Sequence, residues 1–166
     1  MVNGKLNPLD RVYYVKQKSI INNSDAIQVD IKGSDTIKVD SDTFTLRPFH
    51  FHAASENPIQ RKAFPLEVHF VHASEQGQLP VIGFMFEAGK ANPAVEAVLK
   101  HVPSKVNQEK MLTKKPVSLA ALIPDNKYYY RFSGLRNTPS CAEGERWIVM
   151  KNSVSASPAQ LSSFAR

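Results

Sequence analysis

The chain is organised around residues 49–72, which read FHFHAASENPIQRKAFPLEVHFVH. At its start, His50 and His52 alternate with two phenylalanines. Residues two apart in an extended strand point to the same face, so the pattern predicts both imidazoles on one face and both phenyl rings on the other. A second alternating run begins near its end. There Glu67, His69 and Val71 share one face, and the other face has Leu66, Val68, Phe70 and His72.

Pairing of these two strands would bring His50, His52 and His69 together. Three histidines with a fourth, open position are typical of a catalytic zinc site, because the neutral imidazole nitrogen suits zinc and the open position holds water. A His-x-His pair is also common on ordinary half-buried strands, so the spacing alone leaves metal binding open.

The whole segment closely resembles the zinc-binding core of the α-type carbonic anhydrases, especially the bacterial ones. That family reads QFHFH, then SEN or SEH, then PLELHLVH; this chain has PFHFH at 48–52, SEN at 55–57 and PLEVHFVH at 65–72. A later stretch, residues 130–144, resembles the family's YRYSGSLTTPPCSEG loop. The resemblance covers about residues 20–166 and implies a single domain there. Residues 1–19 stay poorly assigned, and the chain is expected to be an incomplete member, abbreviated at both ends.

The resemblance implies a mainly β (α+β) fold, with a central, largely antiparallel twisted sheet and a few peripheral helices. Alternating or apolar runs agree and predict further strands at 27–31, 37–39, 44–46 and 79–86. Residues 147–149 match a further strand of the family. One helix is predicted to begin at Asn92-Pro93, because asparagine is a good N-cap and proline suits the first helical position. Its apolar residues recur as far as Val102, and Pro103 is expected to end it.

The resemblance further implies that zinc is held by His50, His52 and His69. The implied activity is the zinc-dependent reversible hydration of carbon dioxide to bicarbonate and a proton, a carbonate dehydratase reaction. Glu67 matches the family's carboxylate that accepts the other ring N–H of the third histidine and fixes its tautomer. A surface-pairing strand residue is the alternative for Glu67, but its position on the face of His69 favours the supporting role.

Glu56 matches an acidic residue that accepts a hydrogen bond from a threonine, which in turn orients the attacking hydroxide. In this chain Asn137 stands at the threonine position and Thr138 lies beside it. An asparagine amide can both accept and donate, but its reach and angles differ from those of a hydroxyl. A misplaced hydrogen bond at the reacting atoms can lower the rate by about 10²–10³, so the resemblance implies activity that is weakened here.

The substrate pocket departs from the family in the same region. The positions expected to line it are Val71, Val81, Arg136, Glu145 and Trp147. Three of them keep an apolar wall suited to carbon dioxide, whereas the arginine and the glutamate stand where the family has apolar residues. In addition, Pro48 replaces a glutamine that would support the first histidine.

Asp25 occupies the position of the family's proton-shuttle histidine, since NNSD stands here where the family has NNGH. Histidine suits this task because its reference pKa of about 6.5 lies near that of the zinc-bound water. A carboxyl side chain in water titrates roughly three pH units lower, so a slow internal proton transfer is expected. The alternative is a plain turn residue, because Asn-Ser-Asp clusters favour turns.

The composition of the chain limits the kinds of partner and the cellular location that are expected. The net charge is +6 and lysines concentrate in residues 100–115, but that stretch has no aromatic residue, so a solvated loop is expected rather than a nucleic-acid surface. No apolar run approaches a membrane span, and no signal peptide is visible, which predicts a cytoplasmic protein as the chain stands, although bacterial relatives are often periplasmic or secreted. Its single cysteine, Cys141, is predicted to be a free thiol. The oligomeric state is left open.

Three functional hypotheses follow. The first is a zinc enzyme that hydrates carbon dioxide, with reduced activity. The second is a carbonic-anhydrase-like module that keeps zinc but has lost turnover. The third is a truncated product that cannot fold alone, because missing strands would leave apolar surface and backbone groups unpaired.

Overall fold

The computed structural model describes residues 2–5, 16–33, 36–39, 42–112, 118–135 and 143–165. Its strands are β1 Val2–Lys5, β2 Lys16–Asn23, β3 Ala26–Lys32, β4 Thr36–Val39, β5 Asp42–His52, β6 Leu66–Ala73, β7 Pro80–Ala88, β8 Gln108–Met111, β9 Tyr128–Leu135, β10 Glu143–Met150 and β11 Val154–Ala156. Two short α-helices and one 3₁₀ turn accompany them: α1 Pro93–Leu99, η1 Ala120–Leu122 and α2 Pro158–Ser162.

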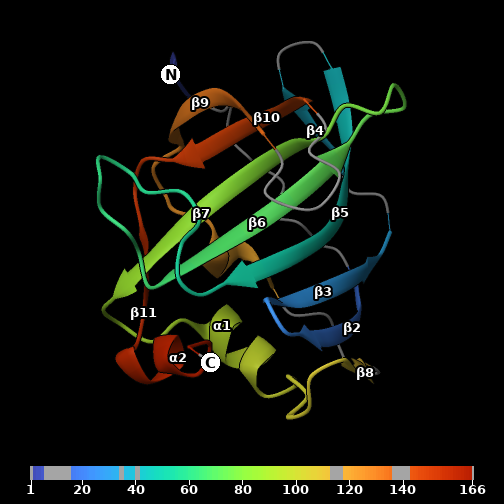
Figure 1. The fold of residues 1–166 in the computed structure, drawn as a ribbon, viewed down its shortest axis with the longest axis vertical. Helices are drawn as coiled ribbons and strands as arrows, with labels where there is room; N and C mark the ends of the chain where they lie inside the picture. The colour runs from blue at the N-terminus through green and yellow to red at the C-terminus, as the bar shows by residue number, and fades with distance from the viewer. Residues whose placement is uncertain are drawn as a thin grey trace.

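The strands form one twisted sheet in the order β1-β9-β10-β7-β6-β5-β3-β2-β8, with β11 added beside β7 and β4 beside β5 (Figure 1). In the described part of the chain, all pairs are antiparallel except β10 with β7 and β11 with β7. The mainly β fold with a largely antiparallel sheet is therefore confirmed. Helices α1 and α2 lie together at one end of the sheet, as Figure 1 shows.

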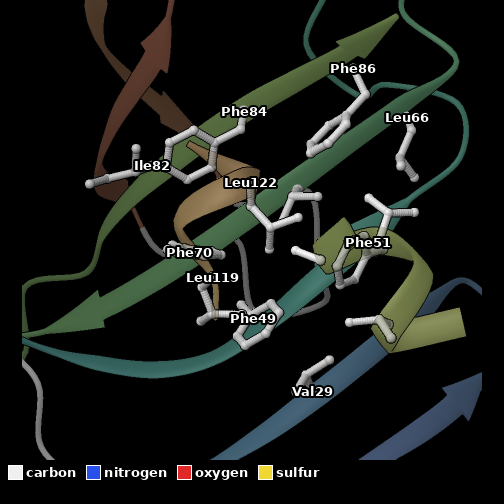
Figure 2. Packing of buried hydrophobic residues seen from close by; sticks show 14 of the residues in the cluster. Val29, Phe49, Phe51, Leu66, Phe70, Ile82, Phe84, Phe86, Leu119 and Leu122 are labelled. Atoms are coloured by element: carbon white, nitrogen blue, oxygen red, sulfur yellow. The ribbon is translucent and has the colours of Figure 1, made fainter. Parts of the chain in front are cut away.

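One face of the central strands builds the main core. Phe49 and Phe51 of β5 are almost fully buried there, as are the alternating apolar residues of β6 and β7 (Figure 2). The two helices and the 3₁₀ turn cover this face, and Phe164, just after α2, stacks its ring on that of Phe51 at 5.2 Å. Burying a large apolar side chain contributes about 1.5–3 kcal/mol, so this face sets the register of the histidines behind it.

The opposite face carries a smaller apolar cluster, made of Phe64, Val81, Met85, Trp147 and Val149. The strands that meet there are β7 and β10, which pair in parallel with Trp147 opposite Val81. The site histidines project from this same face, because they alternate with the core phenylalanines along β5 and β6.

Helix α1 begins as predicted. The Asn92 side chain accepts hydrogen bonds from the backbone N–H groups of Ala94 and Val95, and proline follows it. The helix ends at Leu99, one turn before the last residue of the apolar pattern. A turn at residues 100–101 follows, and the Val102 N–H donates to the Leu99 carbonyl; the helix does not continue, because a following proline disfavours helical backbone in the residue before it.

Strand β5 is longer than the sequence indicates. The short strand predicted at 44–46 runs on without a break into the histidine segment, giving one strand of 11 residues. Its register with β6 shifts between Leu46 and Phe49, and Pro48 lies in this interval. Proline has no N–H to donate, so an irregularity in the ladder is where a strand accommodates it.

Two strands at the sheet edges carry no clear sequence signal. β1 pairs with β9, within the N-terminal residues that the sequence left unassigned. β8 pairs with β2 inside the lysine-rich stretch, where a loop was expected; its residues are exposed, as predicted, but its backbone is bonded. Lys114 and Lys115 lie outside the described residues. No helix in the described ranges is long and apolar enough to cross a membrane.

Candidate metal centre

The three histidines lie on the same face of two neighbouring strands. His50 of β5 stands directly opposite His69 of β6, and His52 stands opposite Glu67. The rings of His52 and His69 approach to 4.5 Å between centroids, and those of His50 and His52 to 6.1 Å. Strand pairing therefore gathers the three residues that the sequence proposes as zinc ligands.

Burial keeps two of these imidazoles neutral. Burial, and after it the nearby His69, lowers the pKa of His50 to about 4 and that of His52 to about 3. Zinc binds imidazole only through an unprotonated nitrogen, so at neutral pH protons do not compete for these two rings. The donor set therefore fits zinc chemically.

Glu67 is fully buried and anchors the site from behind. One carboxylate oxygen accepts hydrogen bonds from the backbone N–H groups of Glu56 and Asn57, at 2.8 and 3.0 Å. The other accepts from the Asn57 side chain at 2.9 Å and lies 2.8 Å from Nε2 of His69. Burial opposes its ionisation, but these bonds to His69 and Asn57 outweigh burial and hold the pKa of Glu67 below its usual value. The carboxylate is placed to fix the His69 ring so that Nδ1 faces the site.

Glu56 lies closer to the histidines than the sequence alone indicates. Its two oxygens are 3.7 Å from Nδ1 of His52 and 3.8 Å from Nδ1 of His69. Donor atoms of these three residues all lie within 4.8 Å of one another, which makes them a possible metal-binding group. The sequence places Glu56 beside the site as an acceptor, but its approach to both rings depends on the loop between β5 and β6.

His50 is not a member of that group, and its Nε2 contacts a residue of β3 instead. It lies 3.1 Å from Oε1 of Gln28, the residue directly opposite His50 on β3. The Gln28 amide in turn donates to Asp30 at 2.6 Å. Neither Gln28 nor Asp30 was singled out from the sequence; the signal available was their alternation with the buried residues of β3, which puts them on the histidine face.

The predicted apolar wall lies beside the histidines. Trp147 is buried and meets the His69 ring edge-on at 5.0 Å, and it belongs to one cluster with Val81 and, at its margin, Val71. Phe132 of β9 stacks on Trp147 at 6.2 Å between centroids and extends the wall. Sequence reasoning missed Phe132, because only the pairing of β9 with β10 brings it there.

The remaining predicted site residues are less well placed by the structure. Asp25 is exposed in the two-residue turn that joins β2 and β3. Arg136, Asn137, Thr138 and Cys141 lie outside the described residues. Glu145 is on β10 opposite Gly134, with its side chain outside the described part of the chain. The roles expected of these residues stay predictions.

Gly83 is a further site residue that sequence reasoning missed. It stands opposite His69 on β7, and a Cβ added there would lie 3.0 Å from Oε1 of Glu67. Glycine thus leaves room for the buried carboxylate. An isolated glycine in an apolar strand indicates a close approach of this kind, although not which group approaches.

Replacing Gly83 by alanine should therefore displace the Glu67 carboxylate. We expect the free energy of unfolding to fall by about 1–3 kcal/mol, the usual cost of overpacking, as measured by urea unfolding. In a Glu67→Ala background, where the carboxylate is gone, the same change should cost clearly less. An equal cost in both backgrounds would contradict the proposed contact.

The comparisons with known proteins agree with this architecture. The family model of the eukaryotic-type carbonic anhydrases matches residues 1–166. A carbonic anhydrase of Pectobacterium carotovorum is 43% identical over 164 residues, which cover 99% of this chain and 67% of that protein. A carbonic anhydrase of Pectobacterium atrosepticum is 41% identical with the same coverage. The solved structure of the Photobacterium profundum α-carbonic anhydrase superposes with a TM-score of 0.85 at 39% identity, covering 92% of this chain and 70% of that one.

The chain belongs to the eukaryotic-type, or α, carbonic anhydrase family. It spans about two thirds of the length of these curated relatives. The relatives support reversible hydration of carbon dioxide, a lyase reaction, as its activity. The family is zinc-dependent, and the structure holds a possible metal-binding group of histidine and glutamate donors.

Proposed function

We propose that this chain hydrates carbon dioxide at the face shared by β5 and β6, with zinc held by His50, His52 and His69. The observation that carries the proposal is that the three histidines meet on one face of the paired strands β5 and β6, with burial holding His50 and His52 neutral and the Glu67 carboxylate behind His69. Zinc bound there supplies the Lewis acidity that lets water lose a proton near pH 7, for which carbonic anhydrases are the standard example.

The protein's own residues orient the metal ligands and line the site with apolar side chains. Glu67 holds the His69 ring through Nε2, which leaves Nδ1 toward the site. Val81 and Trp147, beside that ring, form an apolar wall that suits carbon dioxide, which has no charge or strong dipole to satisfy. Glu56 has both oxygens directed at the site, where an ionised carboxylate can accept a proton or a hydrogen bond.

Removal of metal should abolish the activity. We expect chelator-treated protein to lose carbon dioxide hydration and to regain it when zinc is supplied. Magnesium should not restore it, because that ion demands oxygen ligands in octahedral geometry and this site offers mainly imidazole nitrogen. Stopped-flow hydration assays with metal analysis of the same samples measure both properties. Full activity in protein shown to be free of metal would overturn the proposal.

A further inference from the structure

Hydrogen-bonding contacts connect the side chain of His50 to two side chains of β3, first to Gln28 and through it to Asp30. The Gln28 amide nitrogen donates to Asp30 Oδ1 at 2.6 Å, and its oxygen lies 3.1 Å from Nε2 of His50. Gln28 and Asp30 are two apart on one strand and share a face, and Gln28 pairs directly with His50 across the sheet. The register of β3 against β5 therefore fixes this contact.

Asp30 determines which way the Gln28 amide points. An ionised carboxylate can only accept, so the amide must turn its NH₂ toward Asp30 and its carbonyl oxygen toward His50. That oxygen also only accepts, so the neutral His50 ring must carry its proton on Nε2. The chain of hydrogen bonds Asp30–Gln28–His50 thus fixes both the orientation and the tautomer of His50, leaving its lone pair on Nδ1.

His50 in this position is not ready to share a metal with the other histidines. The donors of His52, His69 and Glu56 lie within 4.8 Å of one another, and His50 is outside that group. Ligands of one zinc ion, each about 2.0–2.2 Å from it, must lie closer together than this limit. Pro48, two residues before His50 on the same strand, has neither a side-chain acceptor nor a donor with which to hold the ring differently.

We propose that Gln28, oriented by Asp30, is a positioning residue that holds His50 away from the metal position and competes with zinc for it. Binding of zinc by all three histidines then requires the His50 ring to leave its contact with Gln28, because no choice of ring nitrogens brings His50, His52 and His69 within 4.8 Å of one another. The inference rests on the proposed zinc site. It means that residues of β3, which are not themselves metal ligands, lower the affinity of the site for zinc.

Gln28→Met removes the acceptor at nearly constant side-chain length. Zinc no longer has to displace this hydrogen bond in the variant, so its affinity should rise by the net value of one hydrogen bond, about 2- to 10-fold. Competition with a chromophoric chelator measures the affinity. Asp30→Ala should raise the affinity in the same direction by less, because the amide remains but is no longer oriented. Gln108→Met, which removes an exposed amide on β8, should leave the affinity unchanged.

A second readout needs no metal. Long-range ¹H–¹⁵N spectra of the zinc-free protein should show His50 protonated on Nε2 in the wild type, and a mixture of tautomers or the other tautomer in Gln28→Met. An unchanged or lower zinc affinity in Gln28→Met, or a wild-type His50 protonated on Nδ1, would overturn the inference. Wild-type protein that binds no zinc would instead count against the proposed function, and zinc binding regained by Gln28→Met would then still support the role of Gln28.

Discussion

Substitution of His52 or His69 by alanine is expected to remove most of the bound zinc. Apparent binding free energies of about 10–16 kcal/mol for four-ligand zinc sites correspond to roughly 3 kcal/mol per ligand, so each loss should weaken zinc binding by about 10²–10³-fold. His50→Ala should also lower the affinity, but by less, because His50 gives up its bond with Gln28 in order to bind. Metal analysis after dialysis against a zinc buffer measures these differences.

His101 provides the matched control. It lies at the end of α1, with Nδ1 2.9 Å from the carbonyl oxygen of Ala97, and takes no part in the metal centre. His101→Ala should therefore keep the full zinc content. The ligand assignment fails if His52→Ala and His69→Ala, both folded, retain zinc as firmly as the His101 variant.

Glu67→Gln is expected to damage both stability and metal binding. Glutamine keeps the size of the side chain, but its NH₂ would face N–H groups at a place where the carboxylate now accepts three hydrogen bonds and lies 2.8 Å from Nε2 of His69. Hydrogen bonds to a charged group contribute about 1.5–3 kcal/mol each, so loss of one or two should lower the free energy of unfolding by about 2–4 kcal/mol. Zinc affinity should fall by about 10–100-fold, because the acceptor that orients His69 is weakened.

The lowered pKa of Glu67 also predicts how the loss of stability in Glu67→Gln changes with pH. Because the pKa of Glu67 is lowered in the folded state, its contribution is complete above its ordinary value of 4.5 and is lost as the pH falls through the folded value. The difference in stability between wild type and Glu67→Gln should therefore be largest near neutral pH and narrow in acid. Glu87→Gln on the neighbouring strand, where the carboxylate is half exposed and paired with Lys62, should change stability little. Equal effects of the two substitutions would contradict the anchoring role of Glu67.

Local patterns in the sequence were sufficient for several parts of the structure. The alternation along residues 49–52 and 66–72 predicted which side chains enter the core and which face the site, because side-chain direction in a strand depends only on the period of two. The cap of α1 at Asn92 was predictable for a similar reason, since capping is decided within three residues. The resemblance to the carbonic anhydrases, which the comparisons confirm, also depended on short contiguous motifs.

Other features depend on pairings between distant segments, which no local pattern specifies. The sequence by itself determined the family, the strand faces of the three histidines and the position of Glu67 behind His69. Only the tertiary structure decided that Gln28 lies opposite His50, that Gly83 makes room for the Glu67 carboxylate, and that Phe132 extends the wall of Trp147. The reason is physical: a strand sets the direction of its own side chains, whereas its register against a strand tens of residues away is set by the packing of the whole sheet.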